Sequence, residues 1–249
     1  MTQPIIINDY PARKGGTENI AVNPGRIAFI LGKSGAGKTA LLEEIEKQGA
    51  FFARPAKDFT TVGAFLVSAA KRHAKWDASL AAEAMEEFHL TAEADGERAA
   101  RLASYVEALA CREDFVLIDD PVTGNEDKDR KMLYMLLRDF CRGECAFVVA
   151  VQDIIDAEFI IDDVVFLENG KLLVAEDRIG LLKRTMYVSG HCKPVEVHTD
   201  GLEKYGEKTN GKITTVVCLM PKNEIVAGSC DVSVQNIRLQ TLYDFMTAK

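Results

Sequence analysis

A glycine-rich segment near the start of the chain has residue types and a spacing suited to phosphate binding. Residues 32–39 read GKSGAGKT, which fits the pattern G-x-x-x-x-G-K-[ST]. Gly32, Gly35 and Gly37 allow a tight turn in which successive N–H groups point inward, around an anion. The apolar run at 26–31 comes before the segment and a helix-forming stretch follows it, and a helix N-terminus also favours a phosphate. The segment therefore predicts a nucleoside triphosphate site; a chance glycine-rich turn is the alternative.

Two side chains at the end of this segment would have specific tasks in such a site. Lys38 would contact the β- and γ-phosphates, and the Thr39 hydroxyl would ligate Mg²⁺. The cofactors predicted by the sequence are therefore ATP and Mg²⁺. The residues that we expect to bind the nucleotide are those of the loop and the next one: Gly32, Lys33, Ser34, Gly35, Ala36, Gly37, Lys38, Thr39 and Ala40.

Two aspartates end a short apolar run about 80 residues after the loop. Residues 115–118 read FVLI, a pattern typical of a buried parallel strand whose carboxyl end carries chemistry. Asp119 would hold Mg²⁺ opposite Thr39, directly or through water, and its alternative role is to cap the next helix. Asp120 is placed to polarise the attacking water. Gln152, which follows the apolar run at 146–151, would sense the γ-phosphate.

The elements that must position these side chains alternate between strand and helix. Apolar runs predict strands, and segments with apolar residues at helical spacing predict helices. This alternation predicts an α/β fold, a P-loop NTPase with a mostly parallel sheet and a helical subdomain at about 58–110. The expected strands are 5–7, 26–31, 51–53, 115–118, 146–151, 164–167 and 171–174; the expected helical segments are 38–48, 61–111 and 128–141.

The character of the sequence changes after about residue 182. Residues 195–198, 213–220 and 231–234 suggest short strands separated by turns, and Ile237 to Met246 suggests a final helix. We therefore expect two domains. An ATP-binding domain would span 1–182, and a small α+β accessory domain at the carboxyl terminus would span 183–249.

Four segments, taken in order, resemble those of the ATP-binding subunit of an ABC transporter. They are NPGRIAFILGKSGAGKTALL, FVLIDDP, VVAVQD and DDVVFLENGKLL, and the resemblance covers about residues 4–175. It implies a phosphate loop, an acidic strand followed by proline, a switch residue at a strand end and a strand that closes with Glu-Asn-Gly-Lys. It also implies that Tyr10, which we expect in a loop after the first strand, stacks on adenine. A core or surface tyrosine is the alternative.

The chain departs from this family at several catalytic positions. Where the family has a glutamate after the Mg²⁺ aspartate, this chain has Asp120, which is one methylene shorter. Where the family has a switch histidine, this chain has Gln152, which cannot titrate. The family's glutamine loop has no clear counterpart, although Arg54 lies in that neighbourhood. These departures imply that the hydrolysis machinery is reduced or shared with a partner.

The family's Leu-Ser-Gly-Gly-Gln signature, which grips the γ-phosphate from the opposing subunit, also lacks a clean copy. Its place, by spacing from Asp119, is taken by residues 94–98, which read ADGER. Two acidic residues there would repel a phosphate. Arg98 could compensate for them, or Asp95 could simply cap a helix.

The resemblance implies a subunit of an exporter-type transporter that couples ATP binding and hydrolysis to a membrane permease. Such a subunit would act as a homodimer or heterodimer, in the cytoplasm and peripheral to the inner face of the cell membrane. It would be an ABC-type ATPase, slow or dependent on its partner. Two alternatives are a nucleotide-dependent regulatory protein with this fold and a P-loop kinase that acts on a small molecule.

Composition sets further bounds on the function. The 249 residues carry a net charge of −8, which argues against nucleic-acid binding. No run of 18 apolar residues is present, and the amino terminus does not read as a signal peptide. Six cysteines without a C-x-x-C pair are best interpreted as reduced, with a zinc or disulfide role as the alternative.

Overall fold

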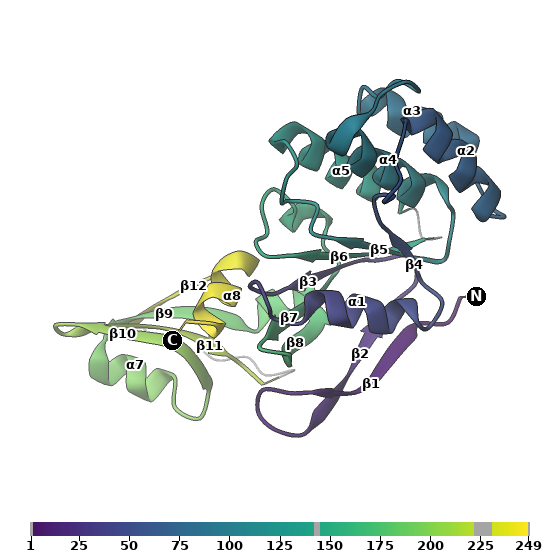
Figure 1. Cartoon of the computed structure of the whole chain (residues 1–249). Helices are drawn as coiled ribbons and strands as arrows, with labels where there is room; N and C mark the ends of the chain where they lie inside the picture. The colour runs from purple at the N-terminus through teal and green to yellow at the C-terminus, as the bar shows by residue number, and fades with distance from the viewer. Residues whose placement is uncertain (1, 142–144, 222–230, 249) are drawn as a thin grey trace. The chain divides into compact units, whose positions relative to one another are not determined.

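The computed structural model describes residues 2–141, 145–221 and 231–248. The chain divides into two units, Met1–Ala175 and Glu176–Lys249. Each unit has its own sheets and helices, which Figure 1 labels.

A six-stranded sheet is the central element of the first unit (Figure 1). Four of its strand pairs, β4–β5, β5–β6, β6–β3 and β3–β7, are parallel, so their carboxyl ends meet at one edge. Strands β3 and β6 are buried along their whole length, as their apolar sequences require. The predicted α/β fold with a mostly parallel sheet is confirmed. In sheet order the strands are β4 (Phe51–Ala53), β5 (Phe115–Asp119), β6 (Ala146–Val151), β3 (Ile27–Leu31), β7 (Asp163–Glu168) and β8 (Lys171–Asp177).

One face of this sheet packs against helix α1 (Lys38–Glu46) and the antiparallel pair β1 (Ile5–Pro11) and β2 (Thr17–Val22). A single buried cluster joins these elements and includes Ile20 from β2, Leu42 from α1 and Leu117 from β5. Burial of this apolar surface is what fixes α1 against the sheet, and α1 begins directly after the glycine-rich loop.

The other face of the sheet is covered by helices, which Figure 1 shows above it. Tyr134 of α5 packs against Phe29 of β3, with ring centroids 5.9 Å apart. Helix α4 contacts α2, α3 and α5 and is buried along most of its length. The predicted helical segments 61–111 and 128–141 are confirmed as α2 (Val62–Arg72), α3 (Ala78–Glu87), α4 (Gly96–Ala110) and α5 (Asp127–Phe140); a 3-10 turn, η1, follows at Glu158–Ile160.

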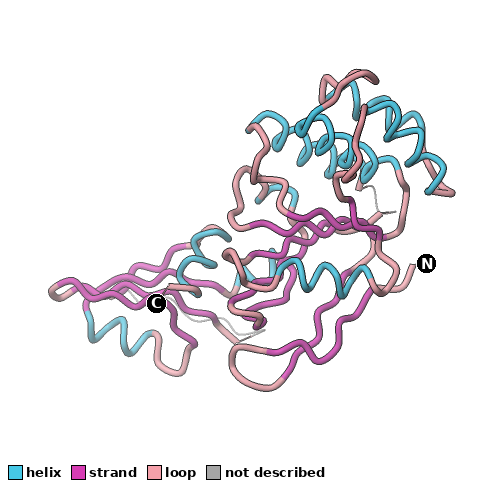
Figure 2. Tube along the Cα trace, viewed as in Figure 1, coloured by secondary structure: helices cyan, strands magenta, loops and turns pink. Residues whose placement is uncertain are grey.

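The second unit is a four-stranded antiparallel sheet with helices on both faces (Figure 2). On one face Val195 of α7 joins the apolar cluster of Val188 and Val216. On the other face Phe245 of α8 packs against Tyr187, with ring centroids 6.0 Å apart. The strands, in sheet order, are β10 (Glu203–Asn210), β11 (Ile213–Leu219), β9 (Thr185–His191) and β12 (Val232–Gln235); the helices are α6 (Arg178–Lys183), α7 (Cys192–His198) and α8 (Leu239–Met246).

Two local predictions are wrong. Residues 195–198 belong to helix α7 and not to a strand. Their alternation of apolar and polar residues is misleading, because Val195 is buried while Val197 is 79% exposed, and Pro194 is tolerated in a first helical turn. Tyr10 lies in strand β1 and not in a loop, because pairing with β2 resumes after a register shift at positions 8–9.

The structure also bears on membrane and metal roles. Among the described residues, no helix is long and apolar enough to cross a membrane. Within the same ranges, no group of three or more His, Cys, Asp or Glu side chains could hold a metal ion. Among the described residues, five cysteines form no disulfide, namely Cys111, Cys141, Cys145, Cys192 and Cys218; Cys230 lies outside the described residues.

Candidate functional site: a phosphate loop and an acidic strand end

The glycine-rich loop joins β3 to α1 at the carboxyl edge of the sheet. It begins where the Gly32 N–H donates a hydrogen bond of 3.2 Å to the carbonyl of Val151. Gly35 and Gly37 have φ values of 77° and 99°, which favour glycine strongly over other residues. A Cβ at Gly32 would lie 2.6 Å from the Cβ of Ala36, so no larger residue fits. The loop is therefore wound tightly enough to require its three glycines.

Lys38 lies at the first position of α1 and folds back along the loop. Its ammonium group donates to the carbonyl of Gly32 at 2.6 Å and to that of Lys33 at 3.2 Å. Burial lowers the pKa of Lys38, and the nearby carboxylates of Asp119, Asp120 and Asp153 oppose that shift. The loop thus holds a buried cation beside a group of acidic side chains.

Thr39 and Asp119 meet at the foot of the loop, although 80 residues separate them in the sequence. The Thr39 hydroxyl donates a hydrogen bond of 2.7 Å to Oδ2 of Asp119. A hydroxyl and a carboxylate are the oxygen ligands that Mg²⁺ prefers. Asp119 does not cap the next helix, because the N-cap residue of α5 is Glu126. These residues fit a magnesium–triphosphate group.

Asp120 is held in a fixed backbone conformation directly after β5. Its φ is 44°, which an aspartate tolerates better than most residues, and its N–H donates to the carbonyl of Ala150 at 2.9 Å. Oδ1 of Asp120 accepts a hydrogen bond of 3.1 Å from the N–H of Thr123. The carboxylate is therefore oriented by its own turn.

Two residues that the sequence did not single out tie this turn to neighbouring groups. Arg101 of α4 donates to the carbonyl of Gly124. The amide of Asn125 donates at 2.9 Å both to the hydroxyl of Tyr105 and to the carbonyl of Pro121. A polar residue whose partner is a backbone carbonyl or a single tyrosine hydroxyl leaves no motif in the sequence, so these contacts could be found only in the structure.

Gln152 and Tyr10 both lie next to the loop. Gln152 is exposed and directly follows Val151, whose carbonyl accepts the Gly32 N–H. The Tyr10 hydroxyl lies 3.6 Å from the position that a Cβ on Gly37 would take. Tyr10 is half-buried, and burial raises its pKa. The fold thus brings the Tyr10 hydroxyl to the loop and places Gln152 directly after the strand end that the loop contacts.

A turn between β7 and β8 supports the loop from another side. The Gly170 N–H donates to the carbonyl of Ala36 at 3.0 Å, and Gly170 and Asn169 both have positive φ values, 74° and 51°. The Asn-Gly pair reverses the chain here, where the sequence predicted only a turn. The role of this turn as a backbone support for the loop was missed.

Residues 94–98 form the start of helix α4. Asp95 is its N-cap residue, but its side chain makes no capping hydrogen bond. The side chain of Glu97 is 94% exposed. Arg98 binds Asp129 of α5 with both ends of its guanidinium, at 2.8 and 2.7 Å. Arg98 is thus engaged with α5, while Glu97 lies 3.9 Å from the guanidinium of Arg101 in an exposed ion pair, so this helix start presents two acidic side chains with one nearby cation.

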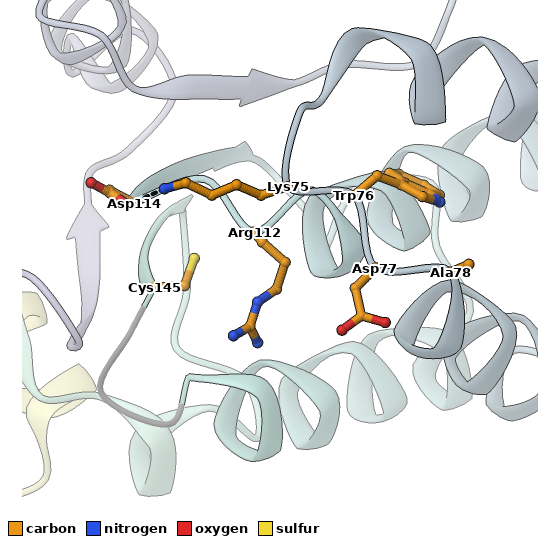
Figure 3. A pocket seen from close by; sticks show the side chains of 7 residues that line it. All are labelled: Lys75, Trp76, Asp77, Ala78, Arg112, Asp114 and Cys145. Atoms are coloured by element: carbon orange, nitrogen blue, oxygen red, sulfur yellow. Dashed lines mark hydrogen bonds and ion pairs between the residues drawn. The ribbon is translucent and has the colours of Figure 1, made fainter.

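A cavity of about 440 Å³ lies away from the loop, near the amino-terminal ends of β5 and β6 (Figure 3). Its polar side chains already have structural partners. Lys75 binds Asp114 at 3.0 Å, and Asp77 caps α3 by accepting the N–H groups of Ser79 and Leu80. The candidate site is therefore the phosphate loop. The cavity is lined by Lys75, Trp76, Asp77, Ala78, Arg112, Asp114 and Cys145.

Comparison with known proteins gives matches among solved structures. No family model matches the chain. No curated protein matches it either. Three of the solved structures that it matches share 15% sequence identity with it over 71% of its length. The ADP conformation of MJ1267, an ATP-binding cassette of an ABC transporter, has a TM-score of 0.54 with 92% of that chain covered.

The other two similar structures have comparable scores. An ATP binding subunit of an ABC transporter has a TM-score of 0.58 over 90% of its length. The cbiO1 protein of Clostridium perfringens, part of the ABC transporter complex cbiONQ, has a TM-score of 0.53 over 89% of its length. Together with the loop and the acidic strand end described above, these matches show that the chain has the fold of an ABC transporter ATP-binding cassette.

Proposed function

We propose that the chain is the ATP-binding subunit of an exporter-type ABC transporter. The observation that carries this proposal is the 2.7 Å hydrogen bond between Thr39 and Asp119 at the foot of a complete phosphate loop. It places two hard oxygen ligands together beside a buried lysine, and that combination suits Mg²⁺ and a triphosphate. Mg²⁺, when bound, would neutralise charge on the phosphates as the bond to the terminal phosphate breaks.

Each residue at this edge of the sheet would have a separate role in binding and hydrolysing ATP. Lys38 would leave the carbonyls of Gly32 and Lys33 to bind the β- and γ-phosphates. Asp120 would accept a proton from the water that attacks the γ-phosphate. Gln152 would donate a hydrogen bond to that phosphate, and Tyr10 would stack on the adenine. Loop residues Gly32 to Ala40 would surround the phosphates.

We further propose that hydrolysis is slow unless a partner contributes to it. Asp95 and Glu97, at the start of α4, would repel a phosphate presented by an opposing subunit. The active form would be a homodimer or a heterodimer with a better-equipped ATP-binding subunit. It would bind membrane permease subunits at the cytoplasmic face of the cell membrane. Residues 1–182 would form the ATP-binding domain and 183–249 the small accessory domain.

Purification of the tagged chain from its native membranes tests the transport role. We expect a polytopic membrane protein to co-purify and to stimulate MgATP hydrolysis, and the Lys38→Ala variant to retain the partner but lose the stimulation. A purely soluble partner would instead favour a regulatory protein. Transfer of the phosphate to a metabolite rather than to water would favour a kinase.

A further inference from the structure

Arg54 is a cation near the carboxyl edge of the sheet. The ATP hydrolysis proposed above gives it no role. Strand β4 pairs in parallel with β5, and Ala53 lies opposite Ile118. Arg54 directly follows β4, and Asp119 is the last residue of β5. Neighbouring strands lie about 4.8 Å apart, so the pairing of Ala53 with Ile118 brings the chain at Arg54 near the proposed Mg²⁺ ligand.

The side chains of Arg54 and Asp119 project to the same side of the sheet. Side chains alternate between the two faces of a sheet along a strand. Arg54 therefore lies on the same face as Phe52, two residues before it, and Asp119 lies on the same face as Leu117. Phe52 and Leu117 both belong to the apolar cluster that packs against α1. Asp119 reaches Thr39 on that side, and Arg54 therefore lies on the face that would hold the triphosphate.

In this structure the guanidinium of Arg54 is held by Glu46. The two groups form paired hydrogen bonds of 2.6 and 2.8 Å, and the guanidinium lies 3.6 Å from the centroid of the Phe52 ring. The pKa of Arg54 is raised, chiefly by these hydrogen bonds and in part by the charges of Glu46, Glu43 and Asp119. Asp119 is thus within electrostatic reach of the arginine.

The pair with Glu46 can be exchanged for another anion at little cost. The side chains of Arg54 and Glu46 are 48% and 36% exposed, and ion pairs at such exposed sites contribute little net stability. Glu46 is the last residue of α1 and Lys38 the first, so the two lie about 12 Å apart along the helix. The side chain of Arg54 points toward Glu46, at the end of α1 that is distant from Lys38, whereas its backbone lies near Asp119. Rotation of the side chain alone could therefore turn the guanidinium toward the phosphate loop.

We propose that Arg54 is an ATP-specific contact whose guanidinium exchanges the Glu46 carboxylate for the terminal phosphate of the bound triphosphate. This inference rests on the proposed function of the loop. Arginine binds phosphate through paired hydrogen bonds that match those it makes with a carboxylate. ADP lacks the terminal phosphate and leaves Arg54 with Glu46. Arg54 thereby distinguishes ATP from ADP.

Equilibrium binding of a non-hydrolysable MgATP analogue and of MgADP tests this exchange in four variants of the full chain. Arg54→Gln is expected to weaken binding of the ATP analogue about tenfold or more and to leave ADP binding unchanged. Glu46→Gln removes the competing charge and is expected to tighten binding of the ATP analogue only. The double variant should bind like Arg54→Gln, because Glu46 acts through Arg54. Lys47→Ala, which removes an exposed cation paired with Glu44 at the same end of α1, should change neither affinity.

Several results would overturn the inference. Equal weakening of both nucleotides by Arg54→Gln, together with a lower melting temperature, would make Arg54 a structural residue. If Glu46→Gln also tightened binding of the ATP analogue in a chain that carries Arg54→Gln, that result would contradict the exchange. If the wild-type chain binds both nucleotides and Arg54→Gln changes neither affinity, only the role of Arg54 is refuted, and the proposed function stands. A wild-type chain that binds neither nucleotide refutes the proposed function and this inference together.

Discussion

At the scale of single residues, the site depends on groups that the fold brings together from distant parts of the sequence. The Thr39 hydroxyl and the Asp119 carboxylate lie 2.7 Å apart and present the oxygen ligands that a hard cation requires. Lys38 is buried in the loop beside them. The proposed anion-binding backbone, the cation and the proposed metal ligands therefore converge at the carboxyl edge of the sheet.

Asp119→Asn should remove the contribution of Mg²⁺ to nucleotide binding. The amide keeps the shape of the side chain but lacks the charge that holds the metal, so MgATP affinity should fall about tenfold or more. Binding measured in excess chelator should not change. Asp114→Asn, at the other end of β5 and paired with Lys75, provides the matched control. Unchanged Mg²⁺ dependence in Asp119→Asn would remove Asp119 from the metal site.

The Asp120→Asn variant should lose the proposed catalytic role of Asp120 and keep its structural role. Asparagine also tolerates a φ of 44° and can still accept the hydrogen bond from Thr123, so stability should not change. ATP turnover should drop about 10²-fold, because an amide cannot accept the proton. Steady-state phosphate release and thermal unfolding measure the two effects. Normal turnover in this variant would show that another group activates the water.

Residues that belong to a motif could be proposed from the sequence, and residues outside any motif could not. Lys38, Thr39 and Asp119 could be proposed as site residues because their chemistry requires those residue types at that spacing, and the structure brings them together at one edge of the sheet. Arg101 and Asn125 act on backbone carbonyls or on a tyrosine hydroxyl, and any polar residue of suitable reach could do so. The ion pair of Arg98 with Asp129 depends on the packing of α4 on α5, which the sequence does not reveal.

At the scale of elements, α4 connects the helical region to the reacting edge of the sheet. Near its start, Arg101 contacts the turn that follows Asp120. Near its end, Glu107 is buried and accepts hydrogen bonds from Arg72, at 2.6 Å, and from His73, at 2.9 Å. The packing of α2 against α4 therefore includes a buried polar cluster whose members depend on one another.

Glu107→Ala should destabilise the first unit by about 1–3 kcal/mol, because it leaves Nε2 of the buried His73 without a hydrogen-bond partner while Nδ1 keeps Glu113 at 3.1 Å. The half-exposed Arg72 keeps access to water, which limits the loss. Urea unfolding of the full chain can be followed by the fluorescence of Trp76, the one tryptophan in the sequence, whose ring centroid lies 6.4 Å from that of His73. Glu97→Ala, at an exposed position of the same helix, should change the free energy of unfolding by less than about 0.5 kcal/mol. Equal effects of the two variants would contradict this account.

The elements that the sequence predicted correctly are those with a strong apolar pattern. Strands β3, β5 and β6 are continuous apolar runs because a parallel sheet is buried on both faces. Strand β10 was missed, since its sequence EKYGEKTN is mostly polar and only its pairing with β11 makes it a strand. Strand β2 was also missed, although the alternation of Ile20 and Val22 could have indicated it. Short segments such as 195–198 have too few residues for a period to be decisive.

At the scale of the whole molecule, the proposed function predicts nucleotide binding with slow turnover. The phosphate loop is complete, but the start of α4 presents Asp95 and Glu97 at the place predicted for the family's signature. We therefore expect the purified chain to hydrolyse MgATP more slowly than about one per second, below the common range for enzymes. Phosphate release measured over a range of protein concentrations tests this. Several turnovers per second by the chain alone would contradict it.

The most direct test of the central claim is the affinity of the full chain for ATP before and after Lys38→Ala. We expect the wild-type chain to bind MgATP and the variant to lose that binding, since Lys38 is the buried cation that we propose binds the phosphates. Isothermal titration calorimetry measures both affinities, and Lys47→Ala provides a control for the loss of a positive charge on α1. Unchanged ATP affinity in Lys38→Ala would show that the loop is not the nucleotide site.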